Sequence, residues 1–203
     1  MIETQLDDGV ATITINRPEK ANALTGVMLR DLIAAVENAR DAHVIILTGK
    51  GKIFSAGAAL EEVQTGLATD PSWETLSQAI ADLPGLSICA LNGTLAGGAF
   101  GMALACDMRI AVPDARFFYP VMKIGVYPQP SDPKRMSALI GPARTKMMLL
   151  CARKIDCDTA LRWGLIDDVS QPDALMEMAR DLGAAAMVNK LDLIRGIKAM
   201  ITD

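Results

Sequence analysis

The sequence has 203 residues, which is enough for one domain with a hydrophobic core. Hydrophobic residues make up 51% and charged residues 22%, a composition that excludes an intrinsically disordered chain. The net charge is −4 and the basic residues are scattered, so no nucleic-acid partner is expected. A single histidine and four cysteines without a C-x-x-C pair predict that no metal is bound.

No part of the sequence approaches the roughly 20 consecutive apolar residues that a membrane-spanning helix needs. The first four residues, M-I-E-T, lead directly into a polar–apolar alternation and lack the pattern of a secretory signal. We therefore expect a cytoplasmic protein that does not interact with membranes.

The predicted elements alternate between strands and helices. Alternating apolar and polar residues predict a strand over residues 10–15, and an apolar face at helical spacing predicts a helix over residues 25–40. Short apolar runs predict buried strands over residues 44–47, 86–91 and 108–112, with helices over residues 76–83 and up to 106 between them. The polar segment 67–73 is predicted to be a mobile loop. Residues 143–151, 158–163, 172–188 and 191–201 are predicted to be helical. This order predicts an α/β domain.

Two segments rich in small residues offer backbone groups to a ligand. The first is A-G-A-A at residues 56–59, and the second is N-G-T-L-A-G-G-A-F-G at residues 92–101, which leads from a buried strand into a helix. The first N–H groups of a helix lack intrahelical acceptors and favour negative charge. Either segment alone is explained by close packing of a helix on a sheet. A dinucleotide fingerprint is disfavoured because Ala96 stands where its first glycine belongs.

Taken together and in this order, the motifs resemble one family. The segments NRPEKANAL, FSAGAAL, NGTLAGGAFGMALACD and ARFFYPVMKIG, followed by ALRWGLIDDV, are similar to signatures of the crotonase, or enoyl-CoA hydratase/isomerase, family. The resemblance runs from about residue 9 to about residue 170. It implies a crotonase-like ββα spiral core over residues 1–170 and a C-terminal helical segment over residues 171–203, shorter than is usual in the family.

The resemblance also implies a site. In the family, two backbone N–H groups form an oxyanion hole for the carbonyl oxygen of a coenzyme A thioester, and the matching residues are Ala58 and Gly98. Two such donors stabilise the negative oxygen of a thioester enolate, and each contributes about 3 kcal/mol to transition-state stabilisation. The residues that match the coenzyme A-binding segments are Lys20, Ala21, Leu24, Ala56 and Ala58. Coenzyme A enters as part of the substrate, and no permanently bound cofactor is expected.

The sequence departs from the family at the positions that carry proton transfer. The two glutamates of the hydratases are replaced by Gly101 and Val121, and the acid that follows the first oxyanion residue is replaced by Ala59. The aspartate used by some dienoyl isomerases and dehalogenases aligns with Gln129. Hydration of a trans-2-enoyl-CoA therefore lacks its usual acid and base.

Asp132 is the candidate that replaces them, because it lies just beyond the active-site segment of the family. The alternative for Asp132 is a turn residue before Pro133. Tyr119 and Tyr127 are further candidates for a proton donor, or else packing residues. His43 is expected on the far side of the sheet and is assigned no catalytic role, which disfavours a serine-peptidase relative of the fold.

The resemblance thus predicts an acyl-CoA-processing enzyme, a lyase or isomerase of the kind found in fatty acid metabolism, with weak ordinary hydratase activity. The alternative is a non-catalytic acyl-CoA-binding protein that keeps the fold and the oxyanion hole. The family forms trimers or dimers of trimers, so a homo-oligomer is expected.

Overall fold

The computed structural model describes residues 1–202, and Asp203, the last residue of the predicted C-terminal segment, lies outside the described residues. Within residues 1–202, ten strands form two sheets, which confirms the predicted α/β class. The larger sheet has the order β1-β2-β3-β5-β7-β10, and all its neighbours run parallel except β1 and β2. Its strands are β1 (Ile2–Asp7), β2 (Val10–Ile15), β3 (Val44–Gly49), β5 (Leu86–Leu91), β7 (Met108–Ala111) and β10 (Asp168–Val169).

The second sheet is smaller and has the order β4-β6-β8-β9. Its strands are β4 (Ile53–Ser55), β6 (Thr94–Ala96), β8 (Arg116–Phe118) and β9 (Ile155–Asp156). The pairs β4–β6 and β6–β8 are parallel, whereas β8 and β9 are antiparallel. None of these strands was predicted, because two or three residues carry too little alternation to be recognised.

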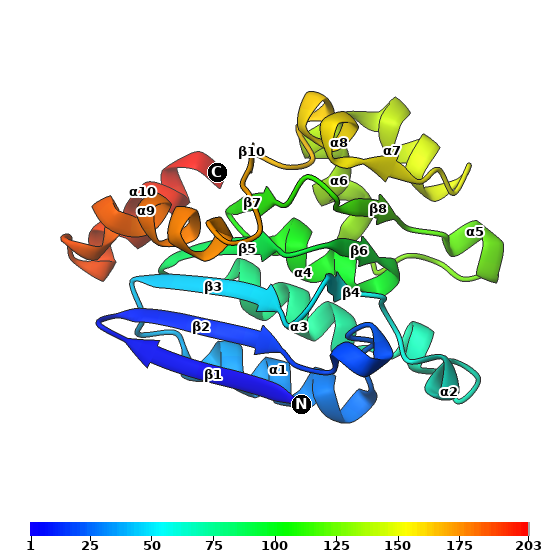
Figure 1. The fold of residues 1–203 in the computed structure, drawn as a ribbon, viewed down its shortest axis with the longest axis horizontal. Helices are drawn as coiled ribbons and strands as arrows, with labels where there is room; N and C mark the ends of the chain where they lie inside the picture. The colour runs from blue at the N-terminus through cyan, green and yellow to red at the C-terminus, as the bar shows by residue number, and fades with distance from the viewer. Residues whose placement is uncertain (203) are drawn as a thin grey trace.

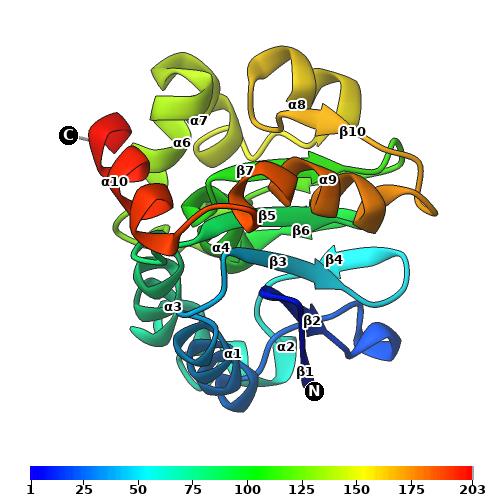
Figure 2. The ribbon, with the colours of Figure 1, turned by 90° about the vertical axis from the view of Figure 1, so that its left-hand side faces the viewer.

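Helices cover the sheets on both sides (Figure 1). Figure 1 shows α1 (Gly26–Asn38), α3 (Ser72–Ala81) and α4 (Phe100–Ala105) behind the strands and α9 (Leu175–Met187) in front of them. The helices α6 (Asp132–Ile140), α7 (Pro142–Leu149) and α8 (Cys157–Trp163) gather at the opposite end from α1 (Figure 2). The remaining helical elements are η1 (Pro18–Lys20), α2 (Leu60–Val63), η2 (Leu67–Thr69), η3 (Gly97–Ala99), α5 (Val121–Ile124) and α10 (Leu191–Thr202).

The C-terminal helices pack directly on this core. Every residue of β3 is buried, as expected of a strand that is covered on both faces. Helix α9 packs against β3, β5 and β7. It approaches so closely that a Cβ atom on Gly183 would lie 2.7 Å from a methyl carbon of Val44. The absence of a side chain at Gly183 is therefore what brings α9 onto the sheet.

One sequence-based prediction is wrong. The segment 67–73, expected to be a mobile loop, contains η2 and the start of α3. Leu67 and Trp73 are buried, and the indole Nε1 of Trp73 donates a hydrogen bond to the carbonyl oxygen of Leu67 at 2.8 Å. Burial of these two apolar side chains orders a stretch whose polar residues alone indicate a loop.

A buried arginine connects β7 to the segment before β10. Arg109 is 4% exposed, and its guanidinium donates to the carbonyl oxygens of Cys106 at 2.7 Å and Leu165 at 3.0 Å. It also forms an ion pair with Asp167 at 3.1 Å. These bonds satisfy carbonyl groups at the end of α4 and after α8 that have little access to water.

We expect Arg109→Met to lower the free energy of unfolding by about 2–4 kcal/mol, because the variant leaves these buried carbonyl groups without donors. Urea denaturation followed by circular dichroism measures this loss. The control is Arg40→Met, because Arg40 is 43% exposed in its side chain and donates one long bond, 3.3 Å, to Asp82. Equal stabilities of the two variants would contradict the assignment.

Candidate active site

The two glycine-containing segments meet because they follow neighbouring parallel strands. Ile53 in β4 pairs with Thr94 in β6, so both strands end at the same edge of the small sheet. The segment after β4 begins at Ala56, and the segment after β6 begins at Gly97. The sequence predicted two separate backbone segments, and the pairing of β4 with β6 brings them together.

The contact between the two segments depends on Gly57. Its φ of +90° lies in the left-handed region, which favours glycine. A Cβ atom there would lie 2.9 Å from the carbonyl oxygen of Ala96 and 3.4 Å from the backbone nitrogen of Gly98. Any side chain at position 57 would therefore push the segments apart.

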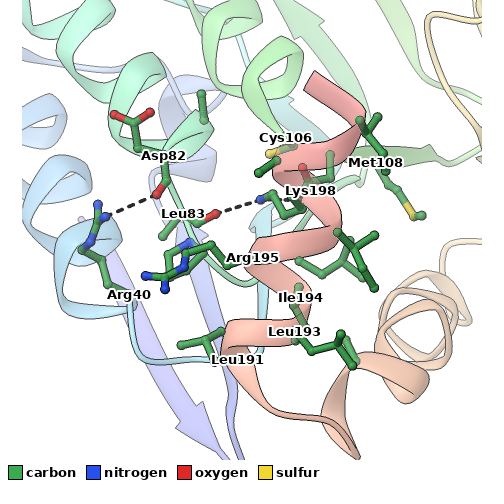
Figure 3. A pocket seen from close by; sticks show the side chains of 18 of the residues that line it. Arg40, Asp82, Leu83, Cys106, Met108, Leu191, Leu193, Ile194, Arg195 and Lys198 are labelled. Carbon is green, nitrogen blue, oxygen red and sulfur yellow. Dashed lines mark hydrogen bonds and ion pairs between the residues drawn. The ribbon is translucent and has the colours of Figure 1, made fainter. Parts of the chain in front are cut away.

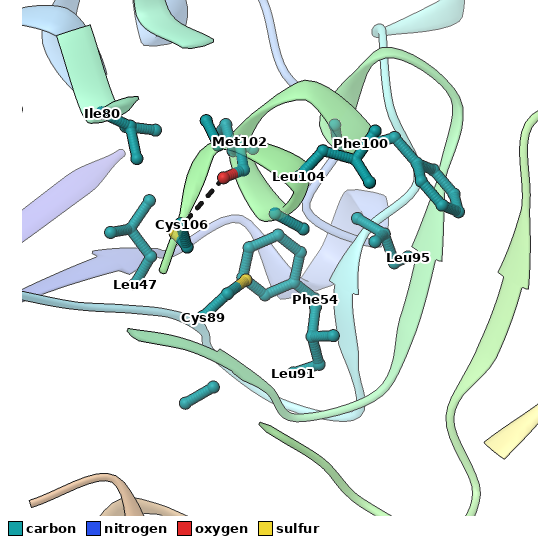
Figure 4. Close-up of a cluster of buried hydrophobic side chains, with 14 of the residues drawn as sticks. Leu47, Phe54, Ile80, Cys89, Leu91, Leu95, Phe100, Met102, Leu104 and Cys106 are labelled. Atoms are coloured by element: carbon teal, nitrogen blue, oxygen red, sulfur yellow. Dashed lines mark hydrogen bonds between the residues drawn. The ribbon is translucent and has the colours of Figure 1, made fainter. Parts of the chain in front are cut away.

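Buried phenylalanines anchor both segments in the core. Phe54 precedes the first segment and Phe100 lies near the end of the second, and both are fully buried. Figure 4 shows Phe54 among Cys89, Leu91 and Leu95, beneath the helix that carries Phe100. The small residues are thus held between rigidly packed neighbours.

The backbone around Ala58 and Gly98, the residues expected to form an oxyanion hole, is arranged as follows. Leu24 and Ala58 form an isolated parallel bridge, in which the nitrogen of Leu24 donates to Gly57 and the nitrogen of Ala59 donates to Leu24. The N–H of Ala58 takes no part in this bridge. Gly98 is the second residue of η3, where a helix leaves its N–H groups without intrahelical acceptors. Ala58 and Gly98 are both partly exposed.

The segment expected to bind coenzyme A lies beside the first glycine segment. The nitrogen of Ala56 donates to the carbonyl oxygen of Ala21 at 3.0 Å, and Lys20 is exposed next to them. Leu24 is fully buried, and its backbone forms the bridge to Ala58. The structure therefore brings together Lys20, Ala21, Leu24, Ala56 and Ala58.

Asn22 is a residue of this region that the sequence analysis missed. It is fully buried, and its side chain donates to the carbonyl oxygens of Lys50 at 3.0 Å and Ile53 at 2.6 Å. Its own carbonyl oxygen accepts a bond from Ser55. Asn22 thus attaches the segment 20–24 to β4. A polar residue within an otherwise apolar A-N-A-L run is the signal that could have indicated it.

Asp132 lies at the start of α6 and is fully buried, rather than in an exposed turn. The hydroxyl of Tyr119 donates to its Oδ2 at 2.8 Å. Within the described residues, its Oδ1 has no hydrogen-bond partner. This oxygen lies 3.2 Å from the point where a Cβ atom on Gly101 would be. The carboxyl group of Asp132 therefore lies against Gly101, the position that the resemblance aligns with a glutamate of the hydratases.

Burial, the largest cause, and the negative charge of Glu74 together raise the pKa of Asp132 to about 7. The hydrogen bond from Tyr119 and the positive charge of Arg135 act in the opposite direction. Burial beside this carboxyl group raises the pKa of Tyr119 well above its ordinary value. The tyrosine therefore stays protonated, while Asp132 exchanges its proton near neutral pH.

A polar network surrounds the buried carboxyl group. The hydroxyl of Ser77 donates to the carbonyl oxygen of Gly101 at 3.0 Å and accepts a short bond from Arg135. Arg135 also donates to Ser131, which donates to Glu74. This network fixes the start of α6, and hence Asp132, against α3.

Within residues 1–202, the other candidate residues make no side-chain hydrogen bond to this carboxyl group, although the backbone N–H of Gln129 donates to the Tyr119 hydroxyl at 3.4 Å. Tyr127 is 90% exposed. Val121 and Ala59 are buried apolar residues, and the buried Gln129 donates to the carbonyl oxygen of Ala68 at 3.4 Å. His43 precedes the amino end of β3, whereas the segment with the coenzyme A candidates follows the carboxyl ends of β2 and β4.

A sizeable cavity lies elsewhere. It measures about 1090 Å³ and lies between α10 and the ends of α3 and α4. Lys198 of α10 crosses it and donates to the carbonyl oxygen of Leu83 at 2.8 Å and to Asp107 at 2.7 Å (Figure 3). None of the residues 56–59 or 97–98 lines it.

Comparison with known proteins supports the resemblance that the motifs indicated. The family model described as enoyl-CoA hydratase/isomerase matches residues 5–202. The chain belongs to the enoyl-CoA hydratase/isomerase family. It is thus a member of a family of acyl-CoA-processing proteins, and the predicted crotonase fold is confirmed. No helix within residues 1–202 is long and apolar enough to cross a membrane.

Curated relatives cover nearly the whole chain. A putative enoyl-CoA hydratase/isomerase, YngF, of Bacillus subtilis is 36% identical over 98% of this chain and 80% of its own length. The 4-chlorobenzoyl coenzyme A dehalogenase-1 of an Arthrobacter species is 34% identical over 91% of this chain and 72% of its own. The short-chain-enoyl-CoA hydratase of Clostridium acetobutylicum is 34% identical over 89% of this chain and 72% of its own length.

Solved structures of the family superpose closely on the chain. Pseudomonas aeruginosa DspI has a TM-score of 0.91 at 32% identity and covers 98% of this chain and 85% of its own. An enoyl-CoA hydratase from Bacillus anthracis has a TM-score of 0.91 at 28% identity. The match covers 100% of this chain and 82% of the hydratase chain.

The contact between Gly101 and Asp132 predicts a compensating pair of substitutions. Gly101→Ala places a methyl group 3.2 Å from the Asp132 carboxyl group and is expected to destabilise the protein by about 1–3 kcal/mol. In an Asp132→Gly background the same change is expected to be neutral or stabilising, since alanine favours a helix over glycine. A double-mutant cycle from urea denaturation measures the coupling, and additive effects would contradict it.

The raised pKa of Asp132 makes stability depend on pH. Its pKa is about 7 in the folded chain and near 4 in an unfolded one, so the folded state binds more protons between these values. This group's contribution is thus fully present below pH 4 and is lost as the pH rises towards 7.

Asp132→Asn removes this dependence. Relative to the unaltered protein, the variant is expected to gain on the order of 2 kcal/mol in unfolding free energy between pH 5 and pH 8. Urea denaturation at both pH values measures the gain. The matched control is the exposed Asp173, and a pH-independent difference for Asp132→Asn would contradict the raised pKa.

Proposed function

We propose that the chain binds acyl-CoA thioesters and stabilises their enolates, with the N–H groups of Ala58 and Gly98 as the oxyanion hole. The observation that carries the proposal is the buried carboxyl group of Asp132 against Gly101, one helical turn beyond Gly98. Residues three apart in a helix lie on the same side. A thioester held by Gly98 would therefore have its α- and β-carbons on the side where a proton-transfer group is available.

Asp132 is suited to act as both acid and base. A group with a pKa near the working pH exists in both protonation states and transfers protons effectively in either direction. Tyr119 binds Oδ2 and leaves Oδ1 without a partner, facing Gly101. We assign the transferred proton to Oδ1 and a positioning role to Tyr119, whose bond keeps the carboxyl group in this orientation.

The coenzyme A moiety would lie over the first glycine segment. Ala21 and Ala56 are hydrogen-bonded to each other, and Lys20 beside them offers a positive charge to phosphate. Leu24 fixes Ala58 through the bridge described above. This arrangement supports the assignment of Lys20, Ala21, Leu24, Ala56 and Ala58 to coenzyme A binding.

The proposal extends to the cellular form of the protein. The family resemblance supports a cytoplasmic homo-oligomer, a trimer or dimer of trimers, with a core over residues 1–170 and a C-terminal helical segment over residues 171–203. The reaction proposed uses the coenzyme A thioester as substrate and only side chains and backbone groups of the protein as catalysts.

A non-catalytic acyl-CoA-binding role is the second candidate. Both positions that carry glutamate in the hydratases hold residues without a carboxyl group, Gly101 and Val121. If Asp132 does not transfer protons, the oxyanion hole alone remains, and it would hold a thioester without converting it.

The experiment is a panel of enoyl-, dienoyl- and β-ketoacyl-CoA thioesters, assayed for binding by calorimetry and for conversion by chromatography. We expect binding, conversion of at least one thioester and weak hydration of crotonyl-CoA. Asp132→Asn is expected to lower the rate by about 100-fold or more with binding retained, whereas Asp173→Asn leaves it unchanged.

Each of the other possible results of this experiment contradicts one part of the proposal. Crotonyl-CoA turnover at rates typical of hydratases would contradict the expected loss of hydration, and full activity of Asp132→Asn would remove the role of Asp132. Binding without any conversion would favour the non-catalytic role, and no binding would overturn the proposed function.

A further inference from the structure

An indole ring covers the second glycine segment. Trp73 lies in the first turn of α3 and is 2% exposed. Three atoms of its ring system, Cδ2, Cε2 and Cε3, would each lie 3.2 Å from a Cβ atom on Gly98. Three equal distances place the face of the ring, rather than its edge, against the α-carbon of Gly98.

A second residue on the same face of α3 contacts the helix α4. Ser77, one turn after Trp73, contacts Gly101, and its Cβ would lie 3.5 Å from a Cβ atom there. Helix α3 therefore lies beside η3 and α4 with Trp73 over Gly98 and Ser77 over Gly101. The two glycines permit this close approach, because a Cβ atom on Gly98 would already press against the indole.

The indole is held by the segment that precedes α3, and that segment is itself fixed. Its Nε1 donates to the carbonyl oxygen of Leu67 at 2.8 Å. The side chain of Gln129 donates to the carbonyl oxygen of Ala68, and this bond ties the segment before Trp73 to the loop that leads to Asp132. A ring fixed in this way keeps one orientation and does not rotate freely.

We propose that Trp73 determines acyl specificity by limiting the site to short acyl groups. The inference rests on the proposed function, because it takes the N–H of Gly98 as a ligand of the thioester oxygen. The first acyl carbons then lie beside Gly98, between the indole and the carboxyl group of Asp132. A long chain would have to pass through the volume that the buried indole occupies, whereas acetyl and butyryl groups end before it.

The test uses saturated acyl-CoAs. Because they have no double bond to which a proton could be transferred, their binding is measured without conversion. Acetyl-, butyryl- and octanoyl-CoA are titrated calorimetrically, with free coenzyme A as the reference for the acyl-independent part of binding. We expect the unaltered protein to bind butyryl-CoA about tenfold or more tightly than octanoyl-CoA. Trp73→Ala is expected to bind octanoyl-CoA at least as tightly as butyryl-CoA, because additional buried methylene groups then gain contacts.

Two further variants keep the test decisive. Trp73→Phe retains an aromatic side chain in the core but is smaller and loses the bond to Leu67, so it is expected to reduce the preference for butyryl-CoA even if Trp73→Ala does not fold. Trp163→Phe is the matched control, since Trp163 lies in α8 and contacts Arg144. It is expected to leave the preference unchanged.

Equal affinity of the unaltered protein for butyryl- and octanoyl-CoA would overturn this inference while leaving the proposed function standing. An unchanged preference in folded Trp73→Ala or Trp73→Phe would do the same. Failure of the folded protein to bind any of the three acyl-CoAs would overturn both the inference and the proposed function.

Discussion

Gly57 has no side chain, and the candidate site depends on this. Because a Cβ atom there would lie 2.9 Å from the carbonyl oxygen of Ala96, only glycine lets the segment after β4 lie against the segment after β6. The parallel pairing of the two short strands sets the direction of this contact, and the bridge between Leu24 and Ala58 holds it from the other side. The oxyanion hole proposed here thus follows from backbone packing and needs no charged side chain.

A second constraint is the limited space beside Gly101. At position 101 a side chain and the carboxyl group of Asp132 compete for the same volume. The resemblance aligns Gly101 with a glutamate of the hydratases, and the structure brings an aspartate from α6 to this position. Burial gives this carboxyl group a pKa near neutrality, which connects the packing of α4 on α6 with the chemistry we propose.

Close packing of α3 serves both the site and the stability of the fold. Ser77 and Trp73 on one face of this helix contact Gly101 and Gly98, and the network through Arg135 joins α3 to α6. The same contacts that exclude water from Asp132 therefore place an aromatic wall beside Gly98. In this arrangement, specificity and acid–base properties depend on one helix–helix interface.

The sequence by itself determined the long elements and the family, because apolar periodicity is a local signal and the motifs around Asn22, Gly57 and Gly98 stand in a fixed order. The resemblance also predicted that two glutamates of the hydratases are absent, at Gly101 and Val121. Only the tertiary structure decided which carboxyl group lies beside Gly101. The positions of Asp132 against Gly101 and of Trp73 over Gly98 result from packing between elements distant in the chain. The strands that align the glycine segments are too short to leave a pattern, and their pairing exists only once the sheet has formed.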